Sequence, residues 1–215
     1  MYYKRISSGG KLRLDVSTEQ SLEYIENMAR NECKVLILDV DGTLRCGNHR
    51  LDLLPSEEYI HYWEDEPNKA FAEFNEQCHN DSPLNSVIDV ANTLISTGEY
   101  YVIVLTSCTY SEHTGSVLTA QLNSWGVESD MILMRHPEIH LWPVEFKEVF
   151  FDQMNLFGDP DRVVMIDDNP DICNMARSKG VLALQCEDWV DLKSPILRCY
   201  EQDGTLWAEM LVLFT

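Results

Sequence analysis

Long hydrophobic runs are absent from this sequence of 215 residues. A helix that crosses a bilayer needs about 20 consecutive apolar residues, and no stretch here approaches that length. The opening segment, 1–16, has no apolar core of the kind that a secretory signal needs. We therefore expect a cytoplasmic protein.

Paired cysteine motifs are also missing. The seven cysteines are scattered, and no two of them form a CxxC pair. Zinc knuckles and disulfide frameworks depend on such regular spacings, so neither is expected. Scattered thiols are instead typical of a reducing compartment.

Basic residues are scarce: 16 lysines and arginines stand against 36 acidic residues, and the formal net charge is −20. A surface of this sign repels long polyanions, so we expect no extended nucleic-acid groove. A small phosphorylated substrate or the end of a nucleic-acid strand remains open as a partner, and so does the oligomeric state. The phosphate-cradling pattern GxxxxGK[ST] is absent as well.

What the chain does contain is a series of short apolar runs. They are rich in Val, Ile and Leu without polar alternation, which is typical of strands buried on both faces of a parallel sheet. The runs are 34–38, 101–105, 131–134, 163–166 and 181–184, and helix-like segments lie between them at 84–97, 112–125, 144–156 and 171–179. This alternation predicts an α/β fold with a doubly wound, Rossmann-like parallel sheet and right-handed crossovers.

Three parts are predicted along the chain. An N-terminal extension covers 1–33 and holds one helix, over 18–29. The core covers 34–190, and a C-terminal extension over 191–215 packs on it. Within the core, the polar and aromatic stretch 45–83 is long for a strand-to-helix connection, so we interpret it as a small helical insertion near the active face.

Polar side chains follow four of the predicted strands. They are Asp39 and Asp41 after the first, Thr106 and Ser107 after the second, Arg135 after the third, and Asp167 and Asp168 after the fourth. Ligands of open parallel sheets bind beyond the carboxyl ends of the strands, so these groups are expected to converge. Clustered carboxylates suit Mg²⁺. One carboxylate can then attack phosphorus, and a second can act as acid and base.

Each motif taken alone also has a purely structural interpretation. Asp-Gly is a common turn pair, and the run from Asp167 to Pro170 is more often a turn or a helix cap. Lys147 alone is most simply a surface residue on a helix. Taken together, the motifs occur in order and at strand ends, and this joint pattern favours an active site over a set of separate structural roles.

These residues resemble the motifs of the haloacid dehalogenase-like superfamily. DVDGT at 39–43 is similar to the first motif, VIVLT ending at Thr106 to the second, Lys147 in VEFKEVF to the third, and VVMIDDNPD at 163–171 to the fourth. The resemblance covers 34–186. It implies a magnesium-dependent phosphatase that works through an aspartyl-phosphate.

The resemblance also implies residue roles. Asp39 is the nucleophile and a magnesium ligand, and Asp41 is the general acid and base that binds the metal through its backbone carbonyl. Thr106 and Lys147 hold the phosphoryl group. Asp168 completes the metal site, with Asp167 supporting it.

A closer resemblance is to the phosphatase module of bacteriophage-type polynucleotide kinase-phosphatases and their stand-alone relatives. It is carried by DGTLRCGNHR, DSPLNSVIDVANTL and MILMRH, and it implies that Arg50 lies close to the substrate phosphate. Arg135 and Ser107 are further candidates for binding substrate. Two departures concern the substrate: Ser107 and Cys108 stand where that subfamily has Gly-Arg, and Pro143 stands where it often has an acid.

Other patterns have two interpretations each. His136 and His140 are a metal pair or part of an ordinary loop, in which Pro137 disfavours a helix. Cys108 is a reactive thiol or a plain small residue that fills the place of the subfamily's arginine. Four aromatic residues either stack a nucleobase or pack the insertion on the core. They are Trp63, Phe71, Phe74 and Trp142.

The leading hypothesis is a phosphomonoesterase for a nucleotide or for a terminal 3′ phosphate of a nucleic acid. Two alternatives remain. One is a phosphatase of small non-nucleotide metabolites. The other is a non-catalytic binding or regulatory protein that keeps the fold.

Overall fold

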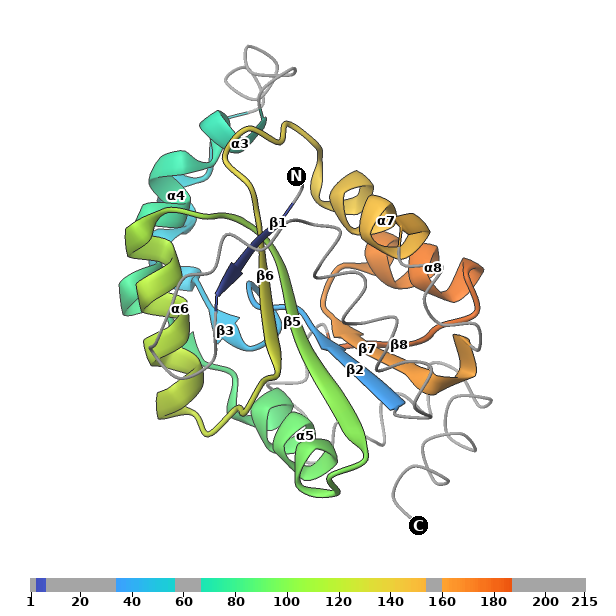
Figure 1. Ribbon diagram of the computed structural model, residues 1–215. Coiled ribbons are helices and arrows are strands. Elements are labelled where there is room, and N and C mark those ends of the chain that lie inside the picture. Colours follow the sequence, from blue (N-terminus) through green and yellow to red (C-terminus); the bar gives the residue numbers. More distant parts are fainter. Residues whose placement is uncertain (1–2, 7–33, 57–66, 154–159, 187–215) are drawn as a thin grey trace.

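The structure is a computed structural model that describes residues 3–6, 34–56, 67–153 and 160–186 (Figure 1). The helix predicted over 18–29 and the extension predicted over 191–215 lie outside these ranges. Among the described residues, no helix is both long enough and apolar enough to cross a membrane.

A six-stranded sheet in the order β1-β6-β5-β2-β7-β8 forms the centre of the molecule. Its parallel strands are β2 (Lys34–Leu38), β5 (Tyr100–Thr109), β6 (Met131–Arg135), β7 (Val163–Asp167) and β8 (Leu182–Gln185). All five apolar runs are strands, which confirms the predicted α/β fold. β2 lies between β5 and β7, so the first motif is at the middle of the sheet.

The remaining strand, β1 (Tyr3–Ile6), was not predicted. It pairs antiparallel with β6, from Tyr3 opposite Arg135 to Ile6 opposite Ile132. Its sequence YKRI is short and charged, as edge strands often are, so it carries none of the apolar signal that marks the buried strands.

Helices cover both faces of the sheet (Figure 1). They are α5 (Asn85–Ser96), α6 (Glu112–Ser124), α7 (Pro143–Gln153) and α8 (Pro170–Ser178). Leu36 and Leu38 of β2 share one core cluster with α5 and α6, whereas Val35 and Ile37 share the other with α7 and α8. Successive side chains of a strand point to opposite faces, so one apolar run fills both cores.

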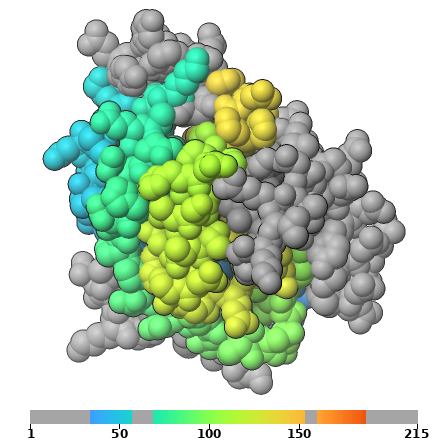
Figure 2. Space-filling view, turned by 60° about the vertical axis from the view of Figure 1, so that its left-hand side comes forward, coloured from blue at the N-terminus to red at the C-terminus, as the bar shows by residue number. Residues whose placement is uncertain are grey.

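The segment 45–83 contains short helical pieces and a small ribbon. The pieces are η1 (Asn48–Leu53), α3 (Pro67–Ala70), α4 (Ala72–Glu76) and η2 (Cys78–Asn80). The ribbon pairs β3 (Arg45–Cys46) antiparallel with β4 (Ser82–Pro83), and it was not predicted. Figure 2 shows the part of this segment that holds α4 and η2 beside α6, where the hydroxyl of Ser111, the N-cap of α6, donates to Glu76 at 2.8 Å.

Candidate active site

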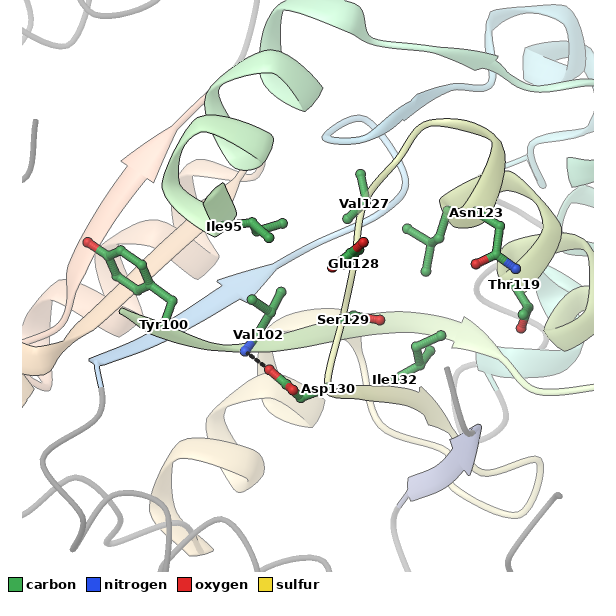
Figure 3. A pocket seen from close by; sticks show the side chains of 11 residues that line it. Ile95, Tyr100, Val102, Thr119, Asn123, Val127, Glu128, Ser129, Asp130 and Ile132 are labelled. Carbon is green, nitrogen blue, oxygen red and sulfur yellow. Dashed lines mark hydrogen bonds between the residues drawn. The ribbon is translucent and has the colours of Figure 1, made fainter. Parts of the chain in front are cut away.

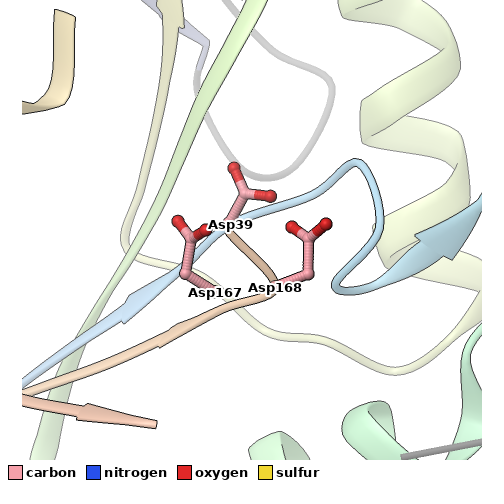
Figure 4. Close-up of side chains that lie close together, drawn as sticks. All are labelled: Asp39, Asp167 and Asp168. Carbon is pink, nitrogen blue, oxygen red and sulfur yellow. The ribbon is translucent and has the colours of Figure 1, made fainter. Parts of the chain in front are cut away.

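The carboxyl ends of β2 and β7 bring three aspartates together. Leu38 pairs with Ile166, and the backbone N–H of Asp39 donates to the Ile166 carbonyl at 3.0 Å. Asp39 therefore lies beside Asp167 and Asp168. One carboxylate oxygen from each of the three lies within 4.8 Å of the others, and Figure 4 shows the side chains projecting from neighbouring strand ends.

Lys147 reaches this cluster from α7. Its Nζ lies 2.5 Å from Oδ1 of Asp39 and 2.6 Å from Oδ2 of Asp167. Lys147 is only 1 % exposed, so its interpretation as a surface residue is wrong. Burial lowers the pKa of the ammonium, but the charges of Asp167 and Asp39 outweigh that effect and raise it. Lys147 is thus a cation at the site.

One lysine does not balance the three carboxylates. Burial raises the pKa of Asp39 well above its ordinary value, and the charges of Asp167 and Asp168 add to this against the opposing effect of Lys147. Burial, followed by the charge of Asp167, raises the pKa of Asp168 to about 6. A further cation would favour the ionised forms, and an all-oxygen donor set of this kind suits Mg²⁺.

The loop after β2 is shaped around Asp168. Gly42 has φ of +82°, in the region that glycine enters without steric cost. The hydroxyl of Thr43, the next residue, donates to Oδ1 of Asp168 at 3.2 Å. The DVDGT motif therefore supplies Asp39 to the acidic cluster and also holds Asp168 through the Thr43 hydroxyl.

The fourth motif both caps a helix and supplies carboxylates. Oδ1 of Asn169 accepts from the backbone N–H groups of Asp171 and Ile172, which caps α8. The backbone N–H of Asn169 in turn donates to Oδ1 of Asp167 at 2.9 Å. The run from Asp167 to Pro170 therefore does cap a helix, and it also supplies two carboxylates to the acidic cluster.

Thr106 and Ser107 lie within β5, which extends to Thr109, and do not follow the strand as predicted. The pairing of Leu38 with Val104 brings Thr106 to the same edge as Asp39. Thr106 is buried, and its hydroxyl accepts from the backbone N–H of Cys108 at 3.0 Å. Ser107 is half-buried.

Cys108 is buried, and burial together with the charge of Asp41 raises the pKa of its thiol to about 12. Thiolates are the reactive form of cysteine. The structure therefore favours the interpretation of Cys108 as a plain small residue that fills space, and not as a reactive thiol.

Asp41 is held by two arginines. Nη2 of Arg50 lies 2.5 Å from its Oδ1, and Nε and Nη2 of Arg45 lie 3.0 and 3.2 Å from its Oδ1 and Oδ2. Burial raises the pKa of Asp41, but the charges of Arg45 and Arg50 outweigh it and hold the pKa below its ordinary value. Sequence reasoning missed Arg45, although its place four residues after Asp41 in a chain poor in cations was a signal.

The two predicted substrate arginines are both buried. Arg50 contacts Asp81 as well as Asp41. Arg135 donates through Nη1 to the carbonyl of Leu141 at 2.6 Å and through Nη2 to the Thr109 hydroxyl at 3.2 Å. Burial lowers the pKa of Arg135 to about 10, and in the described part of the chain no carboxylate pairs with it.

The secondary candidates lie elsewhere or have other contacts. Nδ1 of His136 lies 3.9 Å from a carboxylate oxygen of Glu138, and neither His136 nor His140 belongs to a metal-binding cluster among the described residues. The ring of Phe74 stacks on the guanidinium of Arg50 at 3.8 Å, a contact within the segment 45–83 itself. Trp63 lies outside the described ranges.

A separate cavity of about 450 Å³ lies at the opposite end of the sheet (Figure 3). Its lining includes Tyr100 and Val102 at the start of β5 and Asp130 just before β6, whose carboxylate accepts from the Val102 N–H at 2.8 Å. These residues begin the strands whose other ends form the site, so the cavity does not belong to it.

Comparison with known proteins identifies the fold. No family model and no curated protein matches the sequence. A chain of the Pnkp1/Rnl/Hen1 RNA repair complex is similar in structure, with a TM-score of 0.52 and 19% identity over 74% of this chain and 44% of that chain. A protein from Clostridium difficile that is provisionally named a phosphatase is also similar, with a TM-score of 0.50 and 15% identity over 72% of this chain and 85% of that chain.

At these identities the likeness shows the fold alone. This chain spans less than half the length of the repair-complex chain. The fold shared with both structures is an α/β fold with a central parallel sheet and flanking helices, which confirms the fold class predicted from the sequence.

Proposed function

We propose that this protein is a magnesium-dependent phosphomonoester hydrolase of the haloacid dehalogenase-like type, with Asp39 as its nucleophile. The observation that carries the proposal is the acidic cluster of Asp39, Asp167 and Asp168 with Lys147 buried against it. A chance contact at the surface would not bury a lysine of α7 between the two carboxylates at the ends of β2 and β7.

Magnesium would be held by side-chain oxygens of Asp39, Asp167 and Asp168 and by the backbone carbonyl of Asp41. A bound Mg²⁺ neutralises negative charge on the phosphate and on the carboxylates around it. The three ionised carboxylates exceed the charge of Lys147 by two negative charges, which one divalent cation would balance.

The proposed reaction has two steps. A carboxylate oxygen of Asp39 attacks phosphorus, and the ester oxygen leaves with a proton from Asp41, which produces an aspartyl-phosphate and an alcohol. The arginines lower the pKa of Asp41, so this step requires that the negative charge of the bound phosphate raise it again and let Asp41 take up the proton. Asp41 then takes a proton from water, whose oxygen attacks phosphorus and releases phosphate and the Asp39 carboxylate. Lys147, already 2.5 Å from Asp39, and Thr106 hold the phosphoryl oxygens as their charge develops.

The proposed substrate is a nucleotide or the 3′-terminal phosphate of a nucleic acid. Support comes from the closer motif resemblance and from the likeness in fold to a chain of an RNA repair complex. The net charge of −20 favours a short substrate over a long strand. Arg50, Arg135 and Ser107 stay predictions as substrate-binding residues, and so does a cytoplasmic location.

The test is phosphate release with Mg²⁺ from mononucleotides, from 3′- and 5′-phosphorylated oligonucleotides and from small sugar phosphates. We expect Asp39→Asn to lose about a thousandfold or more of the turnover while its circular dichroism is unchanged. Asp89→Asn, an exposed aspartate of α5, is the matched control and should stay active.

The outcomes separate the hypotheses. Release from 3′ ends alone would identify an end-processing phosphatase, and release from mononucleotides alone a nucleotidase. Release from sugar phosphates alone would favour the small-metabolite alternative. If no compound released phosphate, the proposal would fail in favour of a non-catalytic binding protein, and substantial activity in Asp39→Asn would contradict the mechanism.

A further inference from the structure

Four charged side chains form a network between Asp41 and the segment 45–83, and Nδ1 of His49 lies 3.6 Å from Oδ1 of Asp81 at its edge. Arg50 donates through Nε and Nη2 to Oδ1 and Oδ2 of Asp81, at 2.8 and 2.6 Å. Nε of Arg45 lies 3.1 Å from Oδ2 of Asp81 and 3.0 Å from Oδ1 of Asp41. Each arginine therefore contacts both aspartates.

The β3–β4 ribbon brings these residues together. Asp81 directly precedes β4, and the pairing of Cys46 with Ser82 places it beside the chain that carries Arg45 and Gly47. A β-carbon on Gly47 would lie 2.8 Å from Nε of Arg50, so the glycine leaves room for that guanidinium. The network thus depends on both ends of the segment.

Only one member of the network reaches solvent. The side chain of Asp41 is 28% exposed, whereas those of Arg45, Arg50 and Asp81 are 1%, 1% and 0% exposed. Buried ion pairs add little to stability compared with apolar side chains of the same volume, because the charges lose their hydration. A contribution to stability alone therefore does not account for the arrangement.

The geometry restricts Asp41 in particular. Its Oδ1 contacts both arginines, and its Oδ2 contacts Nη2 of Arg45. Arg45 is itself held from α6, where the Gln121 side-chain carbonyl accepts from its Nη1 at 3.0 Å. A planar guanidinium that binds both oxygens sets the orientation of a carboxylate as well as its charge.

We propose that Asp81 is a positioning residue, which fixes Arg45 and Arg50 so that they orient the Asp41 carboxylate for proton transfer. The segment 45–83 then controls the acid–base chemistry of the site without contacting the reacting phosphorus. This inference rests on the proposed function, in which Asp41 protonates the leaving group and activates water.

The experiment compares Asp81→Asn with wild type on p-nitrophenyl phosphate and phenyl phosphate. Nitrophenolate leaves without a proton, whereas phenolate needs the acid. Because kcat/KM reports the first step alone, we expect it to fall by about tenfold or more on phenyl phosphate and by less than about threefold on p-nitrophenyl phosphate. In Asp81→Asn, water should also attack the aspartyl-phosphate slowly, so this intermediate should accumulate. With p-nitrophenyl phosphate the variant should therefore release a rapid burst of nitrophenol equal to the enzyme concentration before slower turnover.

Two further variants complete the design. Arg45→Lys keeps the positive charge but loses the two-point contact, and it should show the same difference between substrates and the same burst. It also tests the inference if Asp81→Asn does not fold. Asp52→Asn, an exposed aspartate of η1 in the same segment, should match wild type on both substrates.

The outcomes distinguish this inference from the proposed function. Equal losses on the two substrates would show a structural role for Asp81 and overturn the inference. Wild-type behaviour of Asp81→Asn on both substrates would overturn it as well, and so would wild-type behaviour of Arg45→Lys if Asp81→Asn does not fold. If wild type released no phosphate from either compound, the proposed function would fail, and the positioning role would fail with it.

Discussion

A β-carbon placed on Gly42 would lie 2.2 Å from Oδ2 of Asp168. The loop that carries the DVDGT motif therefore passes Asp168 more closely than any residue with a side chain allows. Together with the φ of +82° at Gly42, this contact links the backbone of the first motif to a carboxylate of the fourth.

Gly42→Ala should therefore displace Asp168 as well as strain the backbone. We expect activity to fall by about tenfold or more, as when groups that orient metal ligands are altered, along with the strain of about 1–2 kcal/mol for a side chain at positive φ. Phosphate release and thermal unfolding measure the two effects.

Gly98→Ala is the matched control. Gly98 has φ of +70°, but a β-carbon there would meet nothing within 4 Å. This variant should lose similar stability and keep its activity. Equal activity of the two variants would contradict the role assigned to the contact with Asp168.

Lys147 and Lys179 each pair with two carboxylates, but they differ in burial. The side chain of Lys147 is 1% exposed between Asp39 and Asp167, and that of Lys179 is 26% exposed beside Asp152 and Glu148. Removing one partner of a buried pair leaves uncompensated charge, so Lys147→Met should lose about 3–5 kcal/mol of unfolding free energy.

Lys179→Met should lose less than about 1 kcal/mol, because solvent screens its ion pairs. Urea unfolding at pH 8 without divalent ions measures both variants. Similar losses in the two would show that the buried cluster does not depend on its lysine.

Magnesium should stabilise the folded protein, because only the folded chain brings the three aspartates together. At a concentration 100 times its dissociation constant, a ligand adds about 2.7 kcal/mol, and EDTA should reverse the resulting rise in Tm. Asp168→Asn should lose this rise, and Asp171→Asn, an exposed aspartate in the first turn of α8, should keep it. An equal rise in both variants would place the ion elsewhere.

Cys108 should resist alkylation. With its pKa raised to about 12, about one thiol in ten thousand is ionised at pH 8, and burial blocks access to it. Iodoacetamide at pH 8 should modify Cys46, which is half-buried, and leave Cys108 unmodified by peptide mass spectrometry. Rapid labelling of Cys108 in the folded protein would revive the reactive-thiol interpretation.

Much of the sheet and part of the site could be predicted because their signals are local. An apolar run such as 34–38 can be buried only as a strand or a helix, and its length and its Val and Ile content favour a strand. Asp39 and Asp167 end such runs in a parallel sheet, so their convergence follows from topology alone. The strand β1 and the β3–β4 ribbon lack such runs and were missed.

The partners of the charged residues were not predictable in this way. Arg50 was expected at the substrate, yet its guanidinium contacts Asp81, which lies 31 residues further along the chain. With 36 acidic residues in the chain, an arginine has many possible partners, and ion-pair energies do not depend on sequence distance.

The sequence by itself determined the alternation of the five parallel strands with the four helices between them and the three aspartates at one sheet edge, because periodicity and strand ends are properties of neighbouring residues. Only the tertiary structure decided that Lys147 is buried, that Gly42 lies against Asp168, and that Arg45 and Arg50 are shared between Asp41 and Asp81. These contacts join segments far apart along the chain, and their geometry exists only once the sheet, helices and ribbon have packed.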